Sequence, residues 1–295
     1  MIFKFLKGCG YTNIINGGLY VAAEGDLPIC LCAHMDTVYK VAPVDVYYDS
    51  EQKVFWSPQG LGADDRAGIY IILSLIERGY KPSVIFTDLE EVGGVGAKTL
   101  VSKYPRCPFR DCRALIQLDR QGSIDAVYYD CANEDFELLI TGYGFITDRG
   151  TFSDISIFAP EWGIAAVNLS VGYYDEHREI EILKLEECID TLNKVECMLK
   201  DCINWPKYAY IQKEYKYDYP TEDDDFWRRI LEDEDDDEPV YDWLFDTACY
   251  CCGKSITLDE GILLQSHDKT EDFYVCPKCY ETISKRQNAK DNASN

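Results

Sequence analysis

The stretch from Gly62 to Thr87, GADDRAGIYIILSLIERGYKPSVIFT, encodes a helix followed by a buried strand. Apolar residues recur at helical spacing between residues 67 and 78, which predicts a helix there, and Gly79 ends it. The uninterrupted apolar run over residues 83–87 is typical of a strand that is covered on both faces. A helix that leads into such a strand is the repeating unit of a parallel α/β sheet.

The same alternation extends in both directions from this stretch. Further apolar runs predict strands over residues 28–33, 114–118 and 165–171. Helical spacing predicts helices over residues 96–103 and 183–202, with a helical turn over 152–158. We therefore expect an α/β fold, a three-layer sandwich with a mostly parallel central sheet.

The composition is that of a globular chain without a membrane span. Of the 295 residues, 46% are hydrophobic and 28% are charged, which are ordinary values for a globular domain. No apolar run approaches the roughly 18 residues that a spanning helix requires. The net charge of −24, from 53 acidic and 29 basic residues, argues against nucleic-acid binding through a basic surface. Fourteen cysteines without an export signal indicate a reducing compartment, so we expect a cytoplasmic protein.

The charge is concentrated in one segment, which divides the chain. Residues 214–246 contain 15 acidic and 3 basic residues, a net of −12 out of −24, and such blocks are typical of solvated linkers. The linker also contains two apolar islands, residues 226–231 and 241–245, which are candidates for docking a protein partner. We expect an α/β domain (1–205), an acidic linker (206–247), a cysteine-rich module (248–283) and a polar tail (284–295).

The cysteine-rich module contains two Cys-x-x-Cys pairs with metal-binding spacing. They are Cys249 with Cys252 and Cys276 with Cys279, and 23 residues lie between the pairs. Two such pairs resemble a zinc ribbon, in which four thiolates hold one structural zinc ion. The alternative is a group of free thiols. A ribbon would be a second candidate surface for a protein partner.

Acidic residues and histidines gather where the predicted strands end. They follow the strands or precede the first long helix, and they are His34, Asp36, Asp64, Asp65, Glu90, Glu91, Asp119 and His177. The carboxyl ends of parallel strands meet at one edge of a sheet, where α/β proteins form their sites. So many carboxylates would repel one another unless cations neutralise them, and two metal ions bridged by one aspartate would do so. For each acid alone, the alternative is a solvated loop or a helix N-cap.

These motifs, in this order, resemble the co-catalytic zinc exopeptidases, the clan that includes peptidase T, the bacterial aminopeptidases and the glutamate carboxypeptidases. The resemblance spans residues 29–185 and is especially strong to the peptidase T group over 62–68 and 86–98. It implies two catalytic zinc ions, which cobalt or manganese can replace. By the same resemblance, His34 and Asp119 would hold one ion, Glu91 and His177 would hold the other, and Asp64 would bridge both.

The resemblance also implies roles for the neighbouring acids. Glu90 would be the general base that accepts a proton from the water between the two ions. Asp36 would accept the second ring N–H of His34 and so fix its tautomer. Asp65 would shape the turn behind the bridging residue. We expect Ser153 and Asp154 to cap a helix rather than to line the pocket.

The implied activity is hydrolysis of an amide bond, and we expect an aminopeptidase that cleaves short peptides. The alternative within the clan is a deacylase or amidohydrolase on a small non-peptide amide. The non-enzymatic alternative is a binding protein whose zinc ribbon docks a partner while the first domain serves as a scaffold. Many relatives insert a lid or dimerisation domain, whereas residues 37–63 and 120–176 are each too short to contain one.

Overall fold

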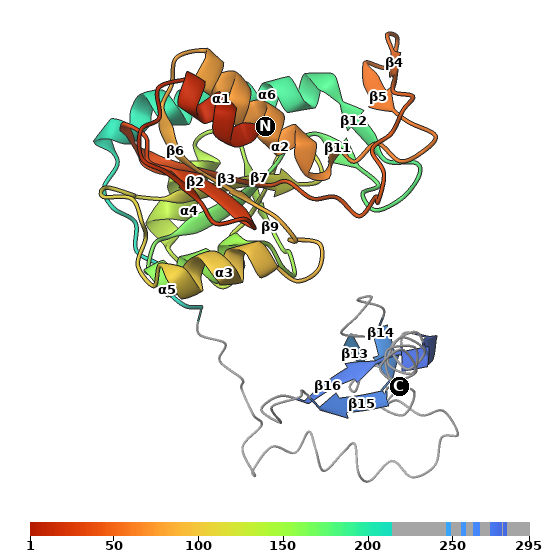
Figure 1. Ribbon diagram of the computed structural model, residues 1–295. Coiled ribbons are helices and arrows are strands. Elements are labelled where there is room, and N and C mark those ends of the chain that lie inside the picture. Colours follow the sequence, from red (N-terminus) through yellow and green to blue (C-terminus); the bar gives the residue numbers. More distant parts are fainter. Residues whose placement is uncertain (214–245, 249–254, 258–261, 266–271, 279, 282–295) are drawn as a thin grey trace, which may run out of the picture. The chain divides into compact units, whose positions relative to one another are not determined.

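The computed structural model divides the chain into two units, Met1–Tyr215 and Lys216–Asn295 (Figure 1). The structure describes residues 1–213, 246–248, 255–257, 262–265, 272–278 and 280–281. Each unit is described by itself below. None of the helices in this described part of the chain has both the length and the apolar character that spanning a bilayer requires.

An eight-stranded mixed sheet forms the centre of the first unit. Its strands, in spatial order, are β1 (Ile14–Asn16), β2 (Tyr20–Ala23), β6 (Pro82–Thr87), β3 (Leu27–His34), β7 (Leu115–Arg120), β10 (Ala166–Ser170), β8 (Asp125–Val127) and β9 (Ile146–Asp148). The four central strands, β6, β3, β7 and β10, run parallel. The sheet continues antiparallel at β2 and β8, the neighbours of this central set. The predicted parallel centre is thus confirmed, and all four predicted strands belong to it.

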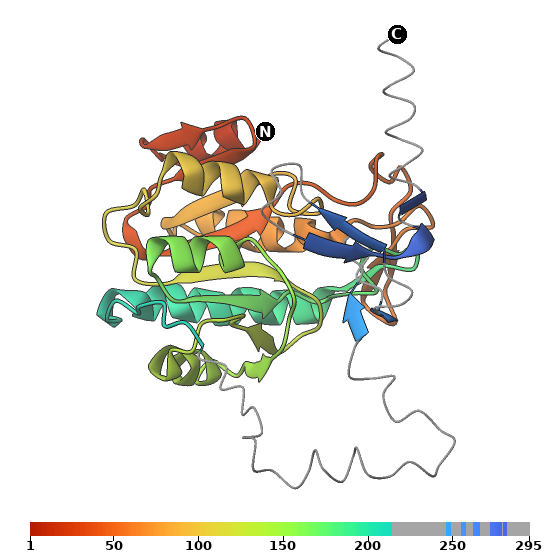
Figure 2. The same ribbon diagram turned by 90° about the horizontal axis from the view of Figure 1, so that it is seen from below.

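Helices cover both faces of this sheet (Figure 1). The helices α1 (Ile2–Gly8), α2 (Ala63–Glu77), α4 (Glu134–Thr141) and α6 (Leu185–Asp201) contribute apolar residues to one core cluster. The helices α3 (Val95–Lys103) and α5 (Ile155–Trp162) contribute theirs to a second cluster on the opposite face. Figure 2, viewed from the side of α3 and α5, shows these two helices lying across the sheet. The three-layer α/β architecture is therefore confirmed.

Strand β3 explains why the two layers form. Its side chains point alternately to opposite faces, as the two-residue period of a strand requires. Leu31 and Ala33 join the cluster under α2 and α6, whereas Cys30 and Cys32 join the cluster under α3 and α5. All four side chains are buried, so an uninterrupted apolar run serves both faces at once.

A second, four-stranded sheet was not expected from the sequence. Its order is β11 (Tyr173–Tyr174), β12 (Ile182–Lys184), β5 (Val54–Trp56) and β4 (Tyr47–Asp49), and all its pairs are antiparallel. The β4–β5 hairpin is formed by the segment between Asp36 and Asp64. Because β12 pairs with β5, this hairpin is joined to the loop that carries His177.

Residues 206–213 belong to the first unit, although the sequence assigned them to the acidic linker. They follow a short 3-10 helix, η1 (Cys202–Asn204). The Tyr208 N–H donates to the carbonyl of Arg113 (2.9 Å), and the Tyr208 carbonyl accepts from Ala165 N–H (3.0 Å). Lys213 N–H donates to the carbonyl of Asp130 (2.8 Å). The remaining residues of the predicted linker before Asp246, including both apolar islands, lie outside the described residues, as does the polar tail.

The second unit contains two antiparallel strand pairs. They are β13 (Asp246–Ala248) with β14 (Ser255–Thr257), and β15 (Ile262–Gln265) with β16 (Asp272–Val275). Cys276 follows β16 directly and is buried. Cys249, Cys252 and Cys279 lie outside the described residues, so the zinc-ribbon site stays a prediction.

Candidate metal centre

The carboxyl edge of the parallel strands brings the predicted site residues together. His34 is the last residue of β3, and Asp119 lies near the end of the neighbouring strand β7. Glu91 follows β6, the strand on the other side of β3. Asp64 lies in the first turn of α2, and His177 lies in the loop between β11 and β12.

Asp64 lies between the two histidines and faces both of them. Its Oδ1 atom is 2.9 Å from Nε2 of His34, and its Oδ2 atom is 3.2 Å from Nε2 of His177. On one side, Asp119 Oδ1 lies 3.3 Å from His34 Nε2. On the other side, Glu91 Oε2 lies 2.9 Å from His177 Nε2. The five side chains therefore form two groups that share one carboxylate.

These distances and donor types fit small divalent cations. Ligands at about 2.1 Å from a tetrahedral ion lie about 3.4 Å from one another, close to the separations found here. One carboxylate oxygen of Glu91 is buried and has no hydrogen-bond partner among the described residues. Ligand atoms of His34, Asp64 and Glu91 also lie within 4.8 Å of one another. The described part of the chain thus contains a candidate His/Asp/Glu metal site.

The pKa values of the two histidines reflect the surrounding negative charge. Hydrogen bonds with Asp64 and Glu91 raise the pKa of His177 to about 10. Burial disfavours protonation of His34, but its carboxylate neighbours, Asp119 first among them, outweigh burial and raise its pKa well above the usual range. Both rings are thereby drawn toward the cationic form, which shows that this edge of the sheet attracts positive charge.

The pKa values of the carboxyl groups reflect the same surrounding negative charge. Burial raises the pKa of Asp119 to about 7, against the opposing effect of His34. Burial, and then the charge of Asp119, raise the pKa of Glu90 to about 9. Positive charge bound between the histidines and carboxylates would lower both values, because it stabilises the ionised carboxylates.

Asp36 connects His34 to the turn that carries the two glutamates. Its Oδ1 atom accepts the N–H of Glu90 (3.1 Å), and its Oδ2 atom accepts the N–H of Glu91 (3.2 Å). The same Oδ1 lies 3.3 Å from Nδ1 of His34, the ring nitrogen that faces away from Asp64. The Glu90 side chain borders the cavity over the site and forms no hydrogen bond or ion pair within the described residues.

Asp65 is adjacent to Asp64 but binds backbone N–H groups, although its carboxylate also lies within 4.8 Å of ligand atoms of His34 and Asp119. The peptide bond between them is cis. The Asp65 carboxylate accepts the N–H of His34 (3.1 Å) and the N–H of Gly68 (3.0 Å). It therefore joins the end of β3 to the first turn of α2, where it holds the backbone behind Asp64.

Two buried acids in or near the site were not assigned correctly from the sequence. Glu181 is fully buried and accepts the N–H of Gly62 (2.5 Å) and of Asp64 (2.9 Å), so it holds the loop before α2. Glu181 belongs to no sequence motif, so its role became visible only from its burial in the structure. Asp154 is the N-cap residue of α5, as expected, but its side chain makes no capping bond: its carboxylate accepts the hydroxyl of Thr87 instead. A buried carboxyl group satisfies its hydrogen bonds with whichever donor the fold brings to it.

A buried polar network orients Asp119. The Gln117 side chain donates to Asp119 Oδ2 (3.0 Å), and the Tyr173 hydroxyl donates to the Asp119 carbonyl (3.0 Å). Asn168, on the adjacent strand β10, accepts the N–H of Asp119 (3.0 Å). These partners were not predicted, because they come from the interiors of strands, where polar residues carry no motif.

No family model and no curated protein matches the chain. Its fold is nevertheless similar to solved structures of peptidases. The aminopeptidase PepT from Bacillus cereus superposes with a TM-score of 0.55 at 16% identity, covering 68% of this chain and 91% of that chain. A tripeptidase from Staphylococcus aureus superposes with a TM-score of 0.57 at 14% identity, covering 69% and 92%. The resemblance drawn from the sequence motifs is thus confirmed at the level of the fold.

Proposed function

We propose that this protein is a metal-dependent hydrolase of amide bonds, an aminopeptidase that acts on short peptides. The observation that carries the proposal is the position of Asp64, whose two carboxylate oxygens each face a different histidine. If Asp64 were only a solvated acid or a helix cap, there would be no reason for it to face two histidines. The similarity of fold to an aminopeptidase and a tripeptidase supports the choice of a peptide substrate.

The ligand sets follow from the two groups. His34 and Asp119 would hold one ion, His177 and Glu91 would hold the other, and Asp64 would contribute one oxygen to each. Nitrogen and oxygen donors of this kind suit zinc, and they also admit cobalt and manganese. Such ions, when bound, would polarise the scissile carbonyl group and lower the pKa of a water molecule.

The chain itself supplies the proton transfer and the orientation of the ligands. Glu90 borders the cavity and makes no competing hydrogen bond among the described residues, so its carboxylate is available to take a proton from the attacking water. It would then deliver this proton to the departing amine. Asp36 holds the backbone N–H groups of Glu90 and Glu91 and faces the outer ring nitrogen of His34. It would therefore fix the tautomer of His34 and the position of the base together.

The Glu90→Gln variant tests this proposal. We expect it to keep the metal content of the unaltered protein and to lose about 10²–10⁴-fold in kcat, because a carboxamide cannot accept the proton. Bound metal would be measured by elemental analysis, and turnover on a panel of aminoacyl peptides and N-acyl amides. Glu161→Gln, on the exposed surface of α5, is the matched control.

Near-normal turnover in Glu90→Gln would overturn the assignment of the base. Loss of metal from this variant would indicate that Glu90 and Glu91 exchange roles. Preference for N-acyl amides over peptides in the panel would replace the aminopeptidase by a deacylase of the same mechanism.

A further inference from the structure

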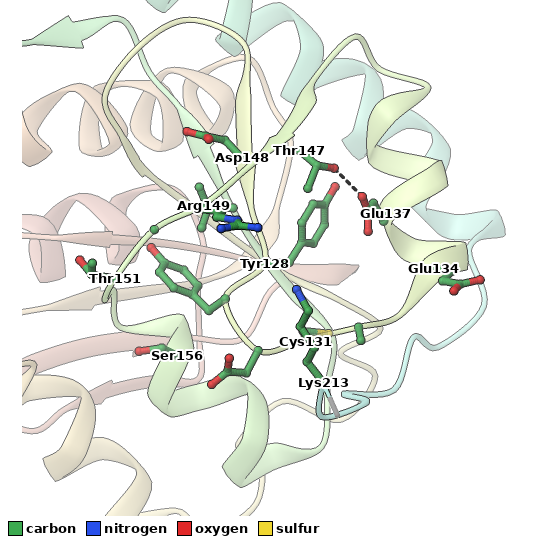
Figure 3. A pocket seen from close by; sticks show the side chains of 15 residues that line it. Tyr128, Cys131, Glu134, Glu137, Thr147, Asp148, Arg149, Thr151, Ser156 and Lys213 are labelled. Carbon is green, nitrogen blue, oxygen red and sulfur yellow. Dashed lines mark hydrogen bonds between the residues drawn. The ribbon is translucent and has the colours of Figure 1, made fainter. Parts of the chain in front are cut away.

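Figure 3 shows a second and larger cavity, which shares lining residues with the one over the candidate metal centre. Its volume is about 750 Å³, against about 170 Å³ for the cavity over the candidate ligands. Tyr129, Gly150 and Thr151 line both cavities, so the two lie side by side at these residues. A molecule whose reacting bond lies at the candidate metal centre would pass these residues to reach the larger space.

Tyr129, which borders both cavities, is held in place by two hydrogen bonds. The Tyr129 hydroxyl donates to the carbonyl of Phe152 (3.1 Å) and accepts a hydrogen bond from the Asn168 side chain (3.1 Å). Asn168 is also the residue that accepts the N–H of Asp119. The position of the larger cavity relative to the metal centre is thus set by the same network that orients a proposed ligand.

Two basic side chains reach into the larger cavity. Figure 3 shows the cationic ends of Arg149 and Lys213 directed toward its centre, while the Asp148 carboxylate points away and Glu134 lies at its periphery. Within the described residues, Arg149 forms no ion pair. Its guanidinium group is therefore available to a ligand.

Four acidic residues also line the cavity, and two of them, Asp148 and Glu137, have other partners; the four are Asp130, Glu134, Glu137 and Asp148. Arg120 donates to the Asp148 carboxylate (2.9 Å) and to the carbonyl of Arg149 (3.3 Å). The first bond engages one oxygen of Asp148, and the second holds the backbone from which the Arg149 side chain projects. Glu137, from α4, accepts the hydroxyl of Thr147 (2.6 Å). The arrangement thus presents a positioned guanidinium group in a chain whose net charge is otherwise strongly negative.

We propose that the larger cavity binds the part of the substrate that lies beyond the cleaved amide bond, and that Arg149 binds a carboxylate there. A guanidinium group matches a carboxylate with two parallel hydrogen bonds, and such charge-assisted pairs are among the stronger polar contacts in proteins. The carboxylate is either the C-terminus of a short peptide or an acidic side chain near it. This inference rests on the proposed peptidase function and assigns to Arg149 the selection of anionic substrates.

The test compares substrates that differ only in this charge. The full-length, metal-loaded protein would be assayed on trialanine, on trialanine amide and on Ala-Ala-Glu amide, and kcat/KM would be measured for each. We expect trialanine or Ala-Ala-Glu amide to exceed trialanine amide by about 10–100-fold, the range of one charge-assisted hydrogen-bonded contact. Which of the two is favoured identifies the source of the carboxylate.

The Arg149→Gln variant should remove this preference and leave turnover of trialanine amide within about twofold of the unaltered protein. Arg149→Lys should retain part of the preference, because it keeps the charge but loses the paired geometry. Arg106→Gln, an exposed arginine outside the cavity, is the matched control and should retain the full preference.

Equal rates on all three substrates in the unaltered protein would overturn the inference while leaving the proposed function intact. An equal loss on charged and amidated substrates in Arg149→Gln would also overturn it, since that result marks a structural role. If no amide bond is cleaved at all, the proposed function fails, and the inference fails with it.

Discussion

Asp64 and Asp65 are adjacent in the chain but have different partners. Asp64 faces His34 and His177 with one oxygen each, whereas Asp65 accepts two backbone N–H groups. At the scale of a single residue, the partners of each carboxylate distinguish Asp64, the proposed metal bridge, from Asp65, a structural support. The same distinction applies to Glu90 and Glu91, of which only Glu91 faces a histidine.

Substitution by asparagine should distinguish the roles of Asp64 and Asp65. Asp64→Asn should lose at least one metal ion, because a carboxamide has a single oxygen and cannot bridge. Asp65→Asn should keep the metals but lower the free energy of unfolding by about 1–3 kcal/mol, since an amide nitrogen cannot accept the second N–H. Elemental analysis and urea denaturation of both variants measure these effects. If Asp65→Asn empties the site while Asp64→Asn does not, the bridging role belongs to Asp65.

At the scale of the elements, helix α2 lies so close to strand β7 that only glycine fits between them. A Cβ atom on Gly68 would lie 1.9 Å from the carbonyl oxygen of Leu118 and 2.5 Å from Oδ1 of Asp65. The close approach of helix and strand places Asp64, at the start of α2, beside Asp119 at the end of β7. A glycine in the helix interior, normally unfavourable, is required here by packing.

Gly68→Ala should therefore lower the free energy of unfolding by about 1–3 kcal/mol or more, because overpacking a core costs this much. It should also weaken metal binding, because α2 must move away from β7. Gly8→Ala is the matched control: a Cβ atom there meets nothing within 4 Å, and its effect should stay within about 0.5 kcal/mol. Urea denaturation compares the two variants, and an equal effect of both would refute the packing argument.

At the scale of the whole molecule, all the proposed catalytic ligands lie in the first unit, and half of the net charge lies in residues 214–246. The backbone hydrogen bonds of Tyr208 and Lys213 extend the first unit past residue 205. A fragment that preserves this unit should therefore end near residue 215.

Limited proteolysis should cut the chain within residues 214–246 and leave residues 206–213 intact. The acidic composition of the former predicts an accessible linker, whereas the latter are hydrogen-bonded to the first unit. Mass spectrometry of the products locates the cut. The fragment of residues 1–215 should keep its proposed metals and amide hydrolysis.

Cys276→Ser complements the proteolysis, because it targets only the predicted ribbon. It should unfold the second unit, which is expected to depend on zinc, and spare the metals of the first. If it abolished catalysis while the first unit remained folded and metal-loaded, the second unit would contribute to the active site.

The sequence by itself predicted the four central strands, the helices α2, α3 and α6, and the gathering of the proposed ligands at one edge of the sheet, whereas α4 was not predicted. This was possible because periodicity and apolar runs are local signals, and because parallel strands necessarily bring their carboxyl ends to one edge. His34, Glu91 and Asp119 could be placed together on that ground alone. The bridging position of Asp64 followed from the resemblance to a known clan, and the distances to both histidines agree with it.

Only the tertiary structure decided what lies around these residues. The three-residue strands β4 and β5 are too short to show a period, and Glu181 meets the loop of Asp64 from 117 residues away. Arg149 belongs to no motif, and the cavity that it enters exists only because β8, β9, α4 and α5 come together. Long-range contacts of this kind depend on how elements pack in three dimensions, and that packing leaves no repeating pattern in the local sequence.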